Sequence, residues 1–170
     1  MNKLKKTAAV ILTALPVMLA AAAIAIHITG KNEEKNGEFH VPPFEEQAVE
    51  GVPYTGREDY RELKITEDFT VSLCTSLTLD TGAEQTAGKT DIYFTSHPQN
   101  RALLRIFLYD SAGNGLYSSG LIRPGEYLKT AELNRIPEQS GKITVKILSY
   151  EPDTYYSAGT AAAEIYLEIN

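Results

Sequence analysis

The sequence predicts an all-β fold: a single antiparallel β-sandwich of about seven strands, preceded by an N-terminal hydrophobic helix and an extended linker. Three observations support this fold class. Runs in which apolar and polar residues alternate recur through the C-terminal two thirds of the chain, and turn-forming residues separate them. No amphipathic helical pattern of convincing length interrupts them. We therefore expect one folded domain at residues 63–170.

The clearest alternation lies in the first expected strand. Phe69, Val71 and Leu73 begin an apolar face that continues to Leu79, and the intervening positions are mostly hydroxyl residues. This alternation is typical of a half-buried strand, and it places Cys74 on the polar face. The seven strands expected from such runs are residues 69–80, 89–96, 102–109, 116–119, 127–133, 142–149 and 161–169.

Turn signals fall between these runs. Asn114 and Gly115 lie between two strand-like segments, and Asn-Gly is a strong signal for a tight hairpin turn. Pro98, Pro124 and Pro152 mark other connections between strands. Short connections of this kind favour neighbouring antiparallel strands.

Residues 1–30 have the pattern of a targeting segment. Lys3, Lys5 and Lys6 precede an uncharged stretch at residues 7–30, which contains small residues suited to signal-peptidase cleavage. The uncharged stretch is also long enough to cross a bilayer as an uncleaved anchor. Both alternatives place the domain outside the cytoplasm, either secreted after cleavage or anchored in the membrane.

Residues 31–62 are rich in Glu, Pro and Gly and contain few apolar residues. Such a composition buries too little apolar surface to offset the entropy of ordering. We therefore expect a flexible linker that holds the domain away from the membrane.

Charge and cysteine content exclude several classes of function. The formal net charge of −6 offers no basic face for nucleic acid. Cys74 is the single cysteine, so an intramolecular disulfide and a cysteine-based zinc cluster are excluded. The remaining roles for Cys74 are packing beside the sheet, an intermolecular disulfide or a reactive thiol.

The chain from about residue 92 to residue 170 resembles the immunoglobulin-like or fibronectin-type-III-like domains of short exported proteins of Gram-positive bacteria. The resemblance is carried by Ser-His-Pro-Gln-Asn at residues 96–100, Arg-Ile-Phe-Leu-Tyr-Asp at 105–110, Gly-Leu-Tyr-Ser-Ser-Gly at 115–120 and Ile-Arg-Pro-Gly-Glu-Tyr at 122–127. It implies an immunoglobulin-like sandwich and a surface or cell-envelope protein without enzymatic activity.

No catalytic, cofactor or metal motif is evident in the sequence. His97 is the one histidine within the expected domain, and no nucleophile motif accompanies it. The acidic residues near Asp110 match a hairpin turn better than a calcium loop. Tyr150, Tyr155 and Tyr156 lie around an expected loop and could stack on sugar rings.

These observations predict a non-enzymatic surface or cell-envelope module that binds another envelope or surface protein, without a cofactor. It could serve as an accessory part of a larger exported assembly. Strand addition at a sandwich edge is a physical route to such binding, with the hydroxyl-rich face at residues 70–78 as one candidate surface. The alternative function is a carbohydrate-binding module that uses the three loop tyrosines.

Overall fold

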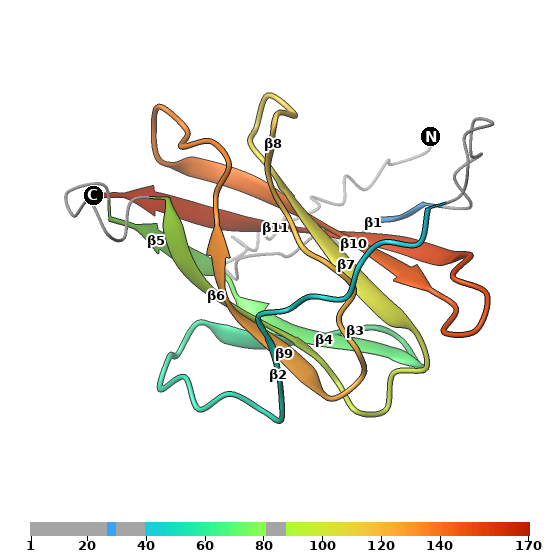
Figure 1. Cartoon of the computed structure of the whole chain (residues 1–170). Coiled ribbons are helices and arrows are strands. Elements are labelled where there is room, and N and C mark those ends of the chain that lie inside the picture. The colour runs from blue at the N-terminus through green and yellow to red at the C-terminus, as the bar shows by residue number, and fades with distance from the viewer. Residues whose placement is uncertain (1–26, 30–39, 81–87) are drawn as a thin grey trace, which may run out of the picture.

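The computed structural model describes residues 27–29, 40–80 and 88–170. The strands are β1 (His27–Thr29), β2 (Ala48–Glu50), β3 (Tyr60–Thr66), β4 (Phe69–Cys74), β5 (Ser76–Leu79), β6 (Lys89–Ser96), β7 (Leu103–Tyr109), β8 (Gly115–Ser118), β9 (Glu126–Glu132), β10 (Gly141–Tyr150) and β11 (Ser157–Ile169). They form two sheets that lie over one another (Figure 1). The prediction of an all-β fold with two sheets is confirmed.

Sheet 1 has the order β1-β11-β10-β7-β8, and β5 also pairs with β11. Sheet 2 has the order β2-β9-β6-β4-β3. All pairs of named strands are antiparallel except β5 with β11. The expected N-terminal helix and targeting segment fall almost wholly outside the described residues, apart from β1. Within the part of the chain that the structure describes, no helix is long and apolar enough to cross a membrane.

The core lies between the two sheets and follows the predicted alternation. In β10, Ile143, Val145 and Ile147 are buried, while the residues between them are more exposed. Phe94 and Leu128 supply fully buried side chains from sheet 2. Burial of one such side chain stabilises the folded state by about 1.5–3 kcal/mol, so the facing sheets are held together mainly by this apolar layer.

The expected strand at residues 69–80 is divided at Thr75. β4 pairs with β3 and β6 in sheet 2, whereas β5 crosses to sheet 1 and pairs with β11. The two-residue period continues through the crossing because both halves direct apolar side chains into the same core. The Asp59 carboxylate accepts a hydrogen bond from the Ser76 backbone N at 2.9 Å and pairs with the Arg57 guanidinium at 2.8 Å. These contacts fix the point at which the chain changes sheets.

Cys74 is buried, with none of its surface exposed. The alternation places it on the outer side of β4, as the sequence indicates, but that position is covered. Burial raises the pKa of the Cys74 thiol to about 11. Packing beside the sheet is therefore the role that fits, and the described fold offers this thiol no route to an intermolecular disulfide or to reactivity.

Residues 43–50, which we call the crossing segment, differ from the expected flexible linker. Leu121 donates its backbone N–H to the Pro43 carbonyl, and Glu45 donates its own to the Leu121 carbonyl, each at 2.8 Å. Farther along, β2 pairs with β9 in sheet 2. The crossing segment thus passes from sheet 1 to sheet 2 across one side of the sandwich (Figure 1). Backbone pairing and the Glu45 carboxylate hold it there despite its few apolar residues.

The hairpin between β7 and β8 uses a different glycine from the one expected. Gly113 adopts a positive φ of 84°, and its N–H donates to the Asp110 carbonyl at 3.0 Å. Asn114 and Gly115 follow this turn, and Gly115 begins β8. The Asp110 carboxylate accepts hydrogen bonds from the backbone N of Ala112 and Asn114 at 2.9 and 2.8 Å. This turn chemistry accounts for the acidic residue without a metal ion.

Candidate functional site

Among the described strands that end a sheet, β3 is the longest. It ends sheet 2 and has seven residues, compared with four in β8, which ends sheet 1. Thr75 donates its backbone N–H to the Asp59 carbonyl at 3.1 Å, which identifies these two residues as a hydrogen-bonded pair. Such pairs alternate along an antiparallel ladder. The backbone groups of Glu62 and Lys64 therefore point away from β4, toward the open side of the sheet.

An open cleft of about 730 Å³ runs beside this edge, between β3 and β11. Leu63 and Ile165, which belong to the core, form the apolar part of its lining. Arg61 lies on the same side of β3 as Leu63, because the two residues are two positions apart along the strand. The residues that line the cleft are Glu58, Asp59, Arg61, Glu62, Leu63, Thr75, Lys142, Glu164, Ile165 and Tyr166. The cleft is a shallow apolar strip with charged walls.

Much of the charge along this cleft is already paired. Lys142 contacts Glu164 at 3.1 Å across β10 and β11, and Arg57 binds Asp59. The hydrogen bonds from Arg57 lower the pKa of the Asp59 carboxyl below its ordinary value. An entering segment therefore meets compensated charges on these walls, and apolar contact would dominate at the floor.

The C-terminal end of β3 is less suited to pairing with an added strand. The register of β3 against β4 shifts between Lys64 and Thr66, and Lys64 forms an ion pair with Glu67 at 3.0 Å. Bulges and charged side chains are common devices that keep edge strands from pairing. The register is regular over residues 60–64, and Arg61, Glu62 and Leu63 of this part border the cleft.

His97 lies outside the cleft and joins three strands. Its Nε2 lies 3.0 Å from the Ser72 Oγ and 3.6 Å from a Glu62 carboxylate oxygen. A serine–histidine–acid triad places the nucleophile and the acid on different ring nitrogens. Here both groups face Nε2, and Ser72 is 4% exposed. The cluster therefore has the geometry of a structural hydrogen-bond network, and no sequence pattern pointed to it.

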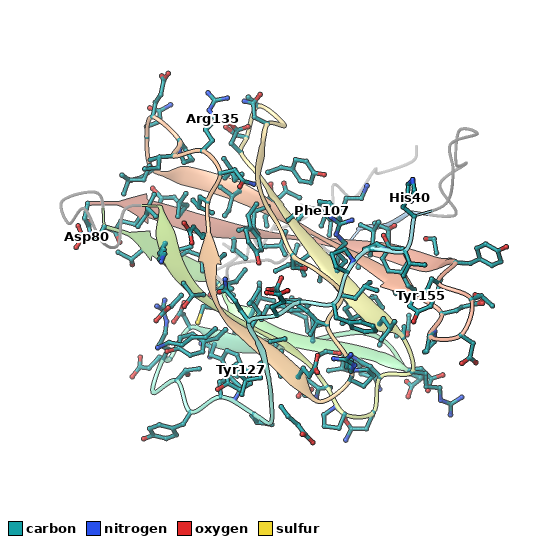
Figure 2. All side chains as sticks on the ribbon, viewed as in Figure 1. His40, Asp80, Phe107, Tyr127, Arg135 and Tyr155 are labelled. Atoms are coloured by element: carbon teal, nitrogen blue, oxygen red, sulfur yellow. The ribbon has the colours of Figure 1, made fainter. Side chains whose placement is uncertain are left out.

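The structure does not bring the three predicted tyrosines together at the cleft beside β3. Tyr150 ends β10, and Tyr155 and Tyr156 belong to the turn before β11. Tyr155 has a positive φ of 58°, so backbone geometry at the turn determines its position. Figure 2 shows Tyr155 at the end of the molecule opposite Asp80. None of the three lines the cleft beside β3.

The hydroxyl-rich face at residues 70–78 is free surface only in part. β4 has neighbours on both sides, so neither of its edges is open. Ser72 and Cys74 are buried, and the Thr70 backbone N and O are both bound by the Asn100 side-chain amide at 2.8 Å. Tertiary contacts therefore cover the β4 half of the face, whereas Thr78 in β5 is exposed.

Among the residues described, no group of three or more His, Cys, Asp or Glu side chains could hold a metal ion. Comparisons with protein-family models, curated proteins and solved structures found no match for this chain. The function must therefore be argued from the geometry of the fold.

Proposed function

We propose that this chain is a non-enzymatic, exported cell-surface or envelope module that binds another envelope protein by accepting one of its strands along β3. The observation that carries the proposal is the open edge at Glu62 beside a cleft floored by Leu63 and Ile165. An added strand would pair with the outward N–H and C=O groups of β3. Its alternate apolar side chains would cover the two core residues.

The partner segment is thus an extended strand with small or medium apolar residues at every second position. Specificity would come from the cleft walls, where Arg61 and Glu58 have no partner among the described residues. Charged side chains of the added strand that oppose these two would favour one register over others. The expected targeting segment, cleaved or retained as an anchor, would place this edge outside the cytoplasm.

The strand order also supports assignment to the immunoglobulin-like class. β4, β6 and β9 lie in one sheet and β7, β10 and β11 lie in the other, while β5, which follows β4 along the chain, pairs with β11. We take this order as support for an immunoglobulin-like sandwich, whose strands also divide between two sheets. β3 is then an additional strand in front of the conventional set, so the proposed binding edge is a feature of this chain.

The test compares two substitutions at one position. Glu62→Pro removes the outward N–H, whereas Glu62→Ala removes the carboxylate and keeps that donor. A photo-crosslinking residue at position 64 of the full chain, expressed in its native cells, would report an added strand. We expect the adduct with Glu62→Ala and its loss with Glu62→Pro. Equal adducts in both variants would overturn strand addition.

Two controls keep the result interpretable. A crosslinker at Lys89, on β6, should give no adduct of the same mass. Since Glu62→Pro could perturb the edge itself, amide exchange provides a second measurement on the unmodified chain. The N–H groups of Glu62 and Lys64 should become protected when the crosslinked partner is added, and unchanged exchange would contradict the proposal.

A further inference from the structure

A second cleft lies on the outer face of sheet 1, away from β3. Its volume is about 540 Å³, within the range of small-ligand sites. The turn after β7 forms one wall, and the outer residues of β10 and β11 form the floor. The lining residues are Tyr109, Asp110, Ser111, Gly113, Lys142, Thr144, Lys146, Thr160, Ala162 and Glu164.

Strand register places aromatic rings beside this cleft. Phe107 pairs with Lys146, and Tyr109 pairs with Thr144, across β7 and β10. The two rings are nearly parallel, with an interplanar angle of 18° and centroids 6.3 Å apart. Phe107, labelled in Figure 2, belongs to β7 of this sheet. Tyr109 lines the cleft and Phe107 continues the aromatic strip beyond the lining, while the short side chain of Ala162 lies on the other side of Lys146.

One cation of this cleft is unpaired. In formal charge, Asp110 and Glu164 balance Lys142 and Lys146 among the lining residues. Asp110 is hydrogen-bonded to the backbone of its own turn, and Glu164 pairs with Lys142 at 3.1 Å. Lys146, on the floor, has no partner among the described residues, so its ammonium group is available to an anionic ligand. Arg105 is outside the lining, with its guanidinium carbon 4.6 Å from the centroid of the Phe107 ring.

We infer that this cleft binds an acidic saccharide. A sugar ring has an apolar C–H face that packs on an aromatic ring such as Tyr109. Its hydroxyl groups would find donors and acceptors in Thr144, Ser111 and the Lys142–Glu164 pair. A carboxylate on the sugar would pair with Lys146. The site shares the Lys142–Glu164 pair with the cleft beside β3, but Tyr109 and Lys146 line this cleft and not the other. It also differs from the tyrosine loop expected from the sequence.

The test uses two disaccharides that differ in charge. Digalacturonate carries carboxylates, and galactobiose with the same linkage does not. Calorimetric titration of the full chain in mild detergent should give saturable binding of digalacturonate and at least about tenfold weaker binding of galactobiose. The affinity for digalacturonate should also fall as sodium chloride is raised.

Variants locate the binding on the molecule. Lys146→Gln should weaken digalacturonate binding by about tenfold or more, and Tyr109→Ala should do so as well. Lys89→Gln, on β6 of the other sheet, is the matched control and should bind like the unmodified chain. Three results would overturn the inference: no saturation up to about 10 mM, equal binding by Lys146→Gln, or equal binding of an acidic polypeptide such as polyglutamate.

Discussion

Gly120 is the position where a single methyl group should do the most damage. A Cβ at this residue would lie 2.6 Å from the Glu45 backbone N and 2.8 Å from the Phe44 carbonyl carbon. Those are backbone atoms of the crossing segment, so they cannot rotate away as a side chain would. In Gly120→Ala the segment must retreat by roughly 0.8 Å to reach an ordinary contact.

The expected loss has two parts. Overpacking of this kind costs about 1–3 kcal/mol. Retreat of the segment also strains the hydrogen bond from the Gly120 N–H to the Glu45 carboxylate, now 2.8 Å, and bonds to charged groups contribute about 1.5–3 kcal/mol. Since the two effects share one displacement, we expect the free energy of unfolding to fall by about 2–4 kcal/mol.

Urea unfolding measures this change, provided that the m-value stays constant. Gly141→Ala is the matched control, because Gly141 has an ordinary φ and no atom within 4 Å of the added Cβ. Its unfolding free energy should stay the same or rise by up to about 1 kcal/mol. A loss of less than about 0.5 kcal/mol in Gly120→Ala would refute the close approach described for the crossing segment.

Three further predictions concern titratable groups. Cys74 should react with a thiol reagent at about pH 8 at least a hundredfold more slowly in the native chain than in urea, because it is buried and its pKa is about 11; similar rates would contradict its burial. The pKa of Asp59 is lowered by Arg57, so its stabilisation is complete above the ordinary value of 3.8 and is lost as the pH falls through the lowered value. As the pH is lowered, the free energy of unfolding should therefore fall less in Asp59→Asn than in the unmodified chain. Parallel curves of unfolding free energy against pH would argue against the Arg57–Asp59 pair. Tyr117→Phe removes a hydrogen bond to Glu45 and should lower the unfolding free energy by about 1–2 kcal/mol, with no change if that bond is absent.

The predicted strands that match the structure best are those with one buried face. In β10 and in residues 161–169 of β11 the two-residue period is uninterrupted, so the sequence alone identifies the inward residues there. β3 escaped prediction because Leu63 and Ile65 are the two apolar residues within a charged strand. An edge strand needs few apolar residues, since it packs on a single neighbouring strand. The change of sheet at Thr75 was not predicted because the alternation of apolar and polar residues does not change there.

The candidate sites were less predictable than the fold. The cleft beside β3 joins Leu63 to Ile165, which lie far apart in sequence and meet through sheet packing alone. Likewise, the place of Lys146 between Phe107 and Ala162 depends on the register of three strands, which the sequence pattern does not give. The loop tyrosines are close together in sequence, but none of them lines the cleft beside β3 or the cleft on the outer face of sheet 1.

The crossing segment has a mechanical consequence. It follows β1 along the chain, so once tension applied from the N-terminus has separated β1 from β11, the load reaches the contacts of Phe44 and Glu45 and then β2. Peeling β2 away would uncover the edge of β9 that it now occupies, at residues 126–128. A tethered chain under load would thereby acquire a second open edge, on the opposite side of sheet 2 from β3.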